Sequence, residues 1–273
     1  MIYSPIDYHN HTSHSWDCRI PMAEMIRAAM DIGLQEIAFT DHFDQFDENM
    51  RRPKYDAQAY FETLKANRTE FESEGITIRA GVEVGEPHLS AEIVRPVLEK
   101  YPYDVVLGSL HFAEGLSMSD ATFFQKYPIQ EAMKRYFGEM TEMVKKGGFD
   151  LLAHLDFPKR RAYKVYGRFD LREFETEVRE VWQACIENGI GIEINTAGLR
   201  HDVNQLHPTV EALTWYREMG GEILTIGSDA HRPSDIGAGT NIALEAALLA
   251  GFDSVTSFEN RQATKRLSIV PIL

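Results

Sequence analysis

The chain has 273 residues, with 28 Lys and Arg against 42 Asp and Glu, so its formal net charge is −14. This acidic balance argues against a surface built to follow a nucleic-acid polymer, because such surfaces are basic. Hydrophobic residues make up 44% of the chain, which is enough to fill a core and excludes an intrinsically disordered protein.

Short, β-branched apolar segments alternate with longer amphipathic segments along the chain, a pattern typical of repeated βα units. Seven strands are predicted, at residues 6–9, 36–40, 77–84, 104–110, 150–154, 191–195 and 222–227. Apolar residues at helical spacing predict helices at 21–32, 57–74, 90–100, 129–146, 171–187, 208–219 and 241–249. No linker interrupts the pattern, which favours one α/β domain over residues 1–273. Periodicity alone is compatible with a barrel or an open, doubly wound sheet.

Polar residues at the strand ends favour the barrel. Nearly every predicted strand runs into a histidine or carboxylate, in the segments DYHNH, FTDH, GVEVGE, GSLH, LLAH, IEIN and TIGSDAH. The carboxyl ends of barrel strands meet at one mouth, whereas an open sheet would spread them apart. These side chains are therefore expected to converge.

The convergent residue types indicate a metal site. His9 and His11 stand two apart on an extended segment, which directs both imidazoles to one face. Imidazole mixed with carboxylate suits zinc, iron or manganese, whereas calcium and magnesium prefer oxygen ligands. We expect divalent transition-metal ions.

These motifs, taken together and in order, resemble those of the polymerase and histidinol phosphatase (PHP) family. The resemblance runs from about residue 7 to 232 and rests on His9-Asn10-His11, Thr40-Asp41-His42, Gly81-Val82-Glu83, His111, His154 and Ser228-Asp229-Ala230-His231. It implies a distorted, TIM-like (βα)7 barrel that holds two or three metal ions.

The resemblance also implies a ligand set. One ion would take His9, His11, Glu83 and Asp229, and Glu83 would bridge to a second ion held by His111 and His154. A third ion would take His42, His231 and Asp17, although Asp17 is also compatible with a solvated loop residue.

Metal ions of this kind ionise water, and the expected reaction is attack of a hydroxide on the phosphorus of a phosphomonoester. Asp229, His231 or a metal-bound water would protonate the leaving alkoxide. Arg160, in AHLDFPKRR, and Arg200, in EINTAGLRH, follow predicted strands and are expected to bind the phosphate through their planar guanidinium groups. Both segments resemble the histidinol-phosphatase branch of the family.

That branch implies L-histidinol phosphate as a small phosphorylated substrate, in histidine biosynthesis. One alternative is a PHP-type phosphoesterase that acts on nucleotides or phosphotyrosine, and another is a non-catalytic module that binds metals or a phosphorylated ligand. No nucleic-acid polymer or membrane is expected as a partner, and the sequence leaves the oligomeric state open.

Other features are compatible with two roles each. Asp41 would either orient a metal ligand or cap a helix. The segment 112–127 would either act as a lid, with its aromatic residues over the substrate, or form an unstructured excursion on the surface. Surface or loop positions are expected for His14, His88, His201 and His207, with His201 near enough to reach substrate. Sparse cysteines, Cys18 and Cys185, and the absence of a signal-like or membrane-spanning segment predict a cytoplasmic protein.

Overall fold

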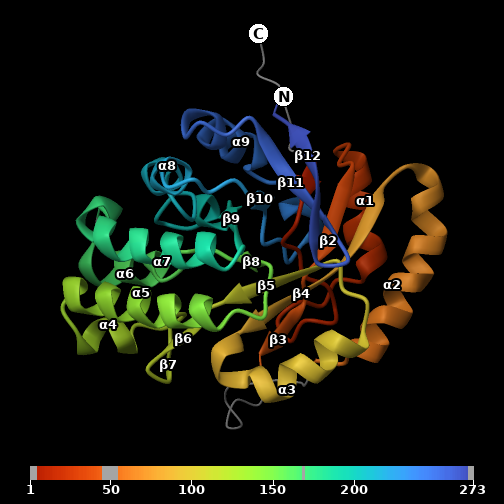
Figure 1. The fold of residues 1–273 in the computed structure, drawn as a ribbon. Coiled ribbons are helices and arrows are strands. Elements are labelled where there is room, and N and C mark those ends of the chain that lie inside the picture. Colours follow the sequence, from red (N-terminus) through yellow and green to blue (C-terminus); the bar gives the residue numbers. More distant parts are fainter. Residues whose placement is uncertain (1–4, 45–54, 168–169, 270–273) are drawn as a thin grey trace.

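A nearly closed parallel barrel forms the centre of the computed structural model, which describes residues 5–44, 55–167 and 170–269 (Figure 1). Its strands pair in the order β1 (Ile6–Asp7), β2 (Glu36–Phe39), β4 (Thr77–Gly85), β5 (Val105–Ser109), β8 (Leu151–Leu152), β9 (Gly191–Asn195) and β10 (Leu224–Gly227). The short strand β3 (His42–Asp44) pairs with the second half of β4. Backbone hydrogen bonds from Tyr8 to Ile226 and from Asp229 to His9 connect the first and last strands. The predicted barrel is confirmed.

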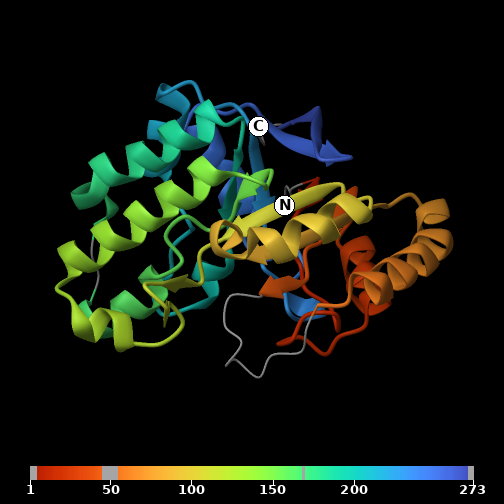
Figure 2. The same ribbon diagram turned by 60° about the horizontal axis from the view of Figure 1, so that its bottom comes forward.

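Helices cover the outside of the barrel, with α1 and α2 on one side and α4 to α7 on the other (Figures 1 and 2). Their bounds are α1 (Met22–Asp31), α2 (Ala57–Phe71), α3 (Pro87–Lys100), α4 (Thr122–Lys126), α5 (Ile129–Lys146), α6 (Lys159–Tyr166), α7 (Glu175–Glu187), α8 (Val210–Glu218) and α9 (Thr240–Leu249). Short 3-10 turns occupy Glu72–Glu74, Leu171–Phe174, Ala197–Arg200 and Pro233–Asp235. No helix in these described ranges is both long and apolar enough to cross a bilayer.

The core lies between the strands and these helices. Strands β2, β5, β9 and β10 are buried at every residue, which explains why their sequences read as continuous apolar runs rather than as alternating patterns. Large side chains such as Trp182, Tyr136 and Phe174 fill the space beneath the helices. This packing holds the strand ends, and hence the polar residues that follow them, in fixed positions.

A C-terminal hairpin that the sequence pattern did not predict lies at the opposite end of the barrel from those strand ends. It consists of β11 (Ser254–Glu259) and β12 (Gln262–Ser268). Arg261 at its turn binds the Asp150 carboxylate, and the Phe258 backbone N–H donates to the Tyr8 hydroxyl. Since Asp150 precedes β8, the hairpin packs against the strand beginnings and leaves the other mouth open.

The segment 112–127 is folded, so its interpretation as an unstructured excursion is wrong. It contains a small hairpin, β6 (Phe112–Ala113) with β7 (Leu116–Ser117), followed by α4. Phe123 and Phe124 are buried in the core, so they do not form the lid over the substrate that was one of the two predicted roles of this segment. Among its aromatic residues, Phe112 does reach the strand-end mouth, where it lines a cavity.

The predicted helices fit the observed ones to within a few residues, with two further differences. The sequence analysis did not predict α6, a short helix whose segment KRRAYKVY is half basic, and the helix predicted at 171–187 begins as a 3-10 turn before α7. These differences leave the order of βα units unchanged.

Candidate metal centre

The structure brings the predicted ligand residues together at the carboxyl ends of the strands. His9 and His11 follow β1, His42 opens β3, Glu83 lies within β4, His111 follows β5, His154 follows β8, and Asp229 and His231 follow β10. Asp17 reaches the same mouth from the loop between β1 and α1. Residues up to 222 positions apart therefore share one site, as the barrel prediction required.

The Glu83 carboxylate lies at the centre and is almost completely buried. Its Oε1 lies 2.9 Å from His154 Nε2 and 3.2 Å from His111 Nε2. Its Oε2 lies 2.9 Å from His42 Nδ1, 3.2 Å from His9 Nε2 and 3.5 Å from His11 Nε2. A single carboxylate thus faces five histidines from four segments, the arrangement that a bridging ligand needs.

A second carboxylate, Asp229, completes the group around His9 and His11. Its Oδ1 lies 3.5 Å from His11 Nε2 and 4.0 Å from His9 Nε2. Asp229 has a left-handed backbone conformation, with φ 56°, as it leaves β10. Aspartate is one of the few residues other than glycine that adopt this conformation readily.

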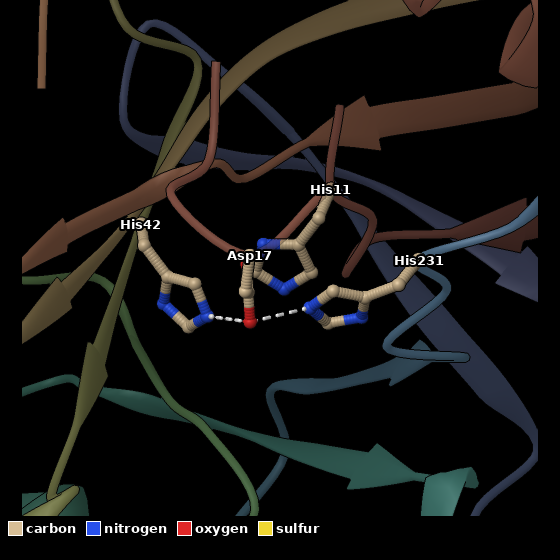
Figure 3. A group of neighbouring side chains, drawn as sticks. All are labelled: His11, Asp17, His42 and His231. Atoms are coloured by element: carbon tan, nitrogen blue, oxygen red, sulfur yellow. Dashed lines mark hydrogen bonds and ion pairs between the residues drawn. The ribbon is translucent and has the colours of Figure 1, made fainter. Parts of the chain in front are cut away.

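Asp17 gathers a more exposed group at the rim, shown in Figure 3. Its Oδ2 lies 3.1 Å from His231 Nε2 and 3.5 Å from His42 Nε2. The His11 ring stacks on the His231 ring with centroids 4.2 Å apart. Asp17 thus lies beside these histidines while it remains exposed in its loop, so its role as a ligand stays a prediction.

Unpaired buried atoms show that these residues fit bound cations. His9 Nε2, His11 Nε2, His42 Nδ1 and Glu83 Oε2 are buried without a hydrogen-bond partner, which is costly unless another group satisfies their lone pairs. Among the described residues, three sets place their ligand atoms within 4.8 Å of one another: His11, Asp17, His42 and His231; His9, His11 and Glu83; and His42, Glu83 and His111. Nitrogen and carboxylate donors in this mixture suit a divalent transition metal.

These sets differ in detail from the ligand groups implied by the resemblance. His11 belongs to both the inner and the rim sets, and His42 belongs to both the rim set and the set around His111. His154 falls in none of the three sets, although its Nε2 contacts Glu83. The shared members make the three positions contiguous rather than separate.

The carboxylates and histidines of the site shift one another's pKa values. Burial raises the pKa of Glu83, but His9, His42 and His111 outweigh burial and hold it well below its usual value. Burial likewise raises the pKa of Asp229, but His11, His9 and Arg160 outweigh burial and hold this pKa well below its usual value. Burial and the neighbouring His231 and His42 lower the pKa of His11 to about 3. The two carboxylates are ionised and His11 is neutral at pH 7. For His9, His42 and His111 the carboxylates outweigh burial and raise the pKa, that of His111 to about 10, so these rings release a proton when they bind a metal ion.

Glu193, in β9, is a functional candidate that the sequence analysis did not single out. Its Oε1 lies 2.7 Å from His9 Nδ1, and its Oε2 accepts a hydrogen bond of 2.9 Å from the His154 backbone N–H. The carboxylate fixes the proton of His9 on Nδ1 and leaves Nε2 free to face Glu83. A side chain at Gly227 would come 2.1 Å from Glu193 Oε1, so glycine is needed there. The sequence signal that could have identified Glu193 is its position as the one charged residue within the otherwise apolar strand GIEIN.

Two further carboxylates support the segments that carry ligands. Asp41 accepts hydrogen bonds from the backbone N–H and hydroxyl of Thr12, at 2.6 and 2.8 Å, and so holds the segment next to His11 rather than capping a helix. Glu86 accepts from the backbone N–H groups of His111 and Phe112, at 2.5 and 2.8 Å. Both act on the backbone and leave the imidazoles free.

The two predicted arginines lie at the site, in different ways. Arg160 Nη2 donates to Asp229 Oδ2 at 3.2 Å, and its guanidinium lies 4.9 Å from the Phe157 ring centroid. Arg200 Nη2 donates to the backbone carbonyls of Ser228 and Asp229, at 2.6 and 3.2 Å. Arg160 thus faces the metal centre directly, whereas Arg200 supports the strand end that carries Asp229.

Two adjoining cavities open at this mouth. One, of about 190 Å³, is lined by Trp16, Phe112 and Phe157 together with the proposed ligands Asp17, His42, Glu83, His111, His154 and Asp229. The other, of about 300 Å³, is lined by Met118, Arg161, Lys164, Arg200, His201 and Asp202. Ser119, Phe157 and Arg160 line both cavities, so Arg160 stands at their boundary.

The remaining histidines divide into those that fit the prediction and those that do not. His201 lines the second cavity, and His14 is partly buried, with its ring edge-on to Tyr60 at 5.8 Å. His207 lies in a loop, as one of the two predicted positions, but it is fully buried, and the prediction is wrong for His88, which is buried in α3. His207 is buried because a carboxylate far away in the sequence, Asp156, accepts its ring N–H at 2.9 Å.

Comparison with known proteins gives a consistent result. The model of the PHP domain family matches residues 7–197. A probable histidinol-phosphatase of Clostridium acetobutylicum is 31% identical over 244 residues, covering 88% of this chain and 92% of the relative. A histidinol-phosphatase of Lactococcus lactis is 24% identical, covering 95% and 96% of the two chains.

Two solved structures have the same fold. The Lactococcus lactis histidinol phosphate phosphatase, complexed with zinc, L-histidinol and phosphate, superposes with a TM-score of 0.87 at 24% identity, covering 95% of this chain and 98% of its own. A putative histidinol phosphatase of Listeria monocytogenes superposes with a TM-score of 0.76 at 19% identity, covering 87% and 99%. The barrel described above is therefore a known arrangement.

Proposed function

The chain belongs to the PHP domain family, and from this premise we propose that it is a metal-dependent phosphomonoesterase that hydrolyses L-histidinol phosphate to L-histidinol and inorganic phosphate. The observation that carries the proposal is the convergence of five histidines from four segments on the buried Glu83, next to a cavity bounded by Arg160. The names of the curated relatives supply the choice of substrate.

Two or three divalent transition ions, with zinc, iron and manganese as candidates, would bind at the three sets of donors. The proposed ligands are His9, His11, Asp17, His42, Glu83, His111, His154, Asp229 and His231. Bound there, the ions would supply ionised water as the nucleophile and positive charge for the phosphoryl oxygens. Glu83 and Asp229 hold negative charge at the centre of the set, and Glu193 keeps the His9 ring oriented.

Arg160 binds the phosphoryl group in this proposal. Its guanidinium lines the cavity that contains Glu83 and contacts Asp229, so its free N–H groups can reach an oxygen held beside the centre. Arg200 lines the neighbouring cavity and would reach the same anion from the other side. Together they supply fixed positive charge where the phosphoryl group gains negative charge.

The leaving alkoxide needs a proton, and His231 is a better donor than Asp229. The pKa of Asp229 lies well below its usual value, so Asp229 is ionised at pH 7. Burial lowers the pKa of His231, but Asp17 and Asp229 outweigh it and raise the pKa above 6.5. We assign proton donation to His231 when its ring is not coordinated.

The size and walls of the two cavities fit a small phosphomonoester. Together they offer Trp16, Phe112 and Phe157 as apolar walls for an imidazole-sized leaving group. The Trp16 ring already stacks on the His42 ring, with centroids 5.7 Å apart.

The formal charge of −14 opposes a polyanionic nucleic acid. Cys18 and Cys185 are free and buried, which suits a reaction in the reducing cytoplasm.

A substrate panel tests the proposal. The metal-loaded protein is assayed for phosphate release from L-histidinol phosphate, a nucleoside monophosphate and phosphotyrosine, and kcat/KM is compared. We expect L-histidinol phosphate to be preferred by about 100-fold or more, since the site must distinguish leaving groups by several buried contacts. A preference for the nucleotide or phosphotyrosine would replace the proposed substrate. Inactivity toward all three esters would favour a binding module without catalysis.

A further inference from the structure

The Arg160 guanidinium is held on three sides. Its Nε donates to His207 Nε2 at 3.2 Å, its Nη2 donates to Asp229 Oδ2 at 3.2 Å, and the Phe157 ring lies beneath it at 4.9 Å. An arginine has five N–H donors, so these two hydrogen bonds leave three for a ligand. An arginine fixed in this way presents its remaining donors in one orientation.

His207 can accept the Arg160 hydrogen bond because Asp156 determines its tautomer. Asp156 Oδ1 lies 2.9 Å from His207 Nδ1, and a carboxylate accepts, so the ring proton resides on Nδ1. Nε2 then carries a lone pair that faces Arg160. Burial and the nearby Lys159 lower the pKa of His207 to about 3, which keeps the ring neutral at pH 7.

The Asp156–His207 pair is rigid. Both side chains are fully buried, and Lys159 Nζ lies 2.7 Å from Asp156 Oδ2 while donating to the Leu206 carbonyl at 2.7 Å. A Cβ added to Gly198 would lie 2.6 Å from His207 Nε2, so the His207 ring is tightly packed against the backbone of Gly198. Neither Asp156 nor His207 lines the two cavities at the mouth of the barrel.

We propose that Asp156 and His207 are positioning residues that act through Arg160, orienting its guanidinium toward the phosphoryl group of the substrate. The inference rests on the proposed function, in which Arg160 binds phosphate. It assigns to the buried pair a role in phosphate affinity that neither residue could exert by contact.

Two substitutions at one position separate this role from a structural one. In His207→Gln the side-chain oxygen reaches the place of Nε2 and can still accept from Arg160. In His207→Asn the amide can still donate to Asp156, but it is too short to reach Arg160. The matched control is His88→Asn, a buried histidine near Glu139 that lies outside both cavities.

The measurements are the inhibition constant of inorganic phosphate, kcat and KM, with metal content and Tm as controls. For His207→Asn we expect the phosphate inhibition constant to rise and kcat/KM to fall by about tenfold, the loss of one hydrogen bond to a charged group, with metal content unchanged. His207→Gln should stay within about threefold of wild type, and His88→Asn should match wild type in affinity. Equal affinities in all four proteins would overturn the inference.

A double-mutant cycle with Arg160→Ala makes the test specific, because a positioning residue has no effect once the positioned residue is gone. His207→Asn should leave the phosphate inhibition constant of Arg160→Ala unchanged. A further tenfold loss in that background would show that His207 acts independently of Arg160 and would refute the role proposed here. A wild-type enzyme that cleaves a phosphomonoester other than L-histidinol phosphate changes the proposed substrate and leaves this cycle measurable with that ester.

Discussion

Replacing Glu193 with glutamine tests whether the orientation of His9 sets the metal affinity. In the native site the carboxylate accepts from His9 Nδ1 at 2.7 Å, from the His154 backbone N–H at 2.9 Å and from Asn195 Nδ2 at 3.2 Å. A glutamine of the same shape has one accepting oxygen and one donating NH2 group. If the glutamine oxygen accepts from His9, its NH2 group faces the two donors on His154 and Asn195. If the amide is flipped, the NH2 group faces the proton on His9 Nδ1.

Either orientation loses at least one hydrogen bond to the histidines of the centre. Substitutions of residues that orient metal-bound histidines typically cost about 10- to 100-fold in metal affinity or activity. We therefore expect metal affinity to fall in this range, equivalent to about 1.4 to 2.8 kcal/mol. The fold should persist, because the substitution changes no volume.

The assay is competition with a chelator of known affinity, combined with kcat/KM as a function of metal concentration. Activity of Glu193→Gln should recover as the metal concentration is raised. The control is Glu36→Gln, which alters a buried carboxylate at the beginning of β2, where Tyr8 and Ser257 bind it far from the centre. Metal affinity in Glu193→Gln equal to that of the wild type would refute the argument that Glu193 orients His9.

Three further predictions concern the rim, the metals and pH. Asp17→Asn should remove one metal ion per chain, as measured by elemental analysis, because Asp17 is the carboxylate between His42 and His231. Chelator treatment should lower Tm by roughly 10 °C in a thermal melt, since ligand at about 1,000 times its dissociation constant adds about 4 kcal/mol to stability. His207 has a folded-state pKa of about 3, below 6.5, so its contribution to the free energy of unfolding is present above pH 6.5 and is lost as the pH falls toward 3. Denaturant titrations should show a slope of up to about 1.4 kcal/mol per pH unit in this window, smaller in His207→Gln, and identical slopes would contradict the assignment.

The parts of the site that could be predicted are those whose signal is local. His9, His42 and His231 stand in short motifs directly after apolar, β-branched runs, and a parallel barrel brings all such positions to one mouth. The order of the βα units followed from the periodicity, whereas the choice of a barrel over an open sheet rested on the polar residues at the strand ends. For this reason the sequence alone predicts a common site for the ligand residues.

The parts that could not be predicted depend on partners far apart in the sequence. Glu193 acquires its role from His9, 184 positions away, and His207 is buried because of Asp156, 51 positions away. Nothing in the neighbouring residues distinguishes such a buried, paired side chain from an exposed one. The β11–β12 hairpin was missed for a similar reason, since Arg261 is held by Asp150, just before β8, and Phe258 by Tyr8, just after β1.

Metal content measured together with activity tests the central claim most directly. Purified protein is stripped with a chelator, reconstituted with zinc, iron or manganese, and analysed for metal ions per chain while hydrolysis of L-histidinol phosphate is followed. The arrangement around Glu83 predicts two or three bound ions per chain, with activity rising as they bind. Full activity in protein that holds fewer than two ions per chain would contradict it.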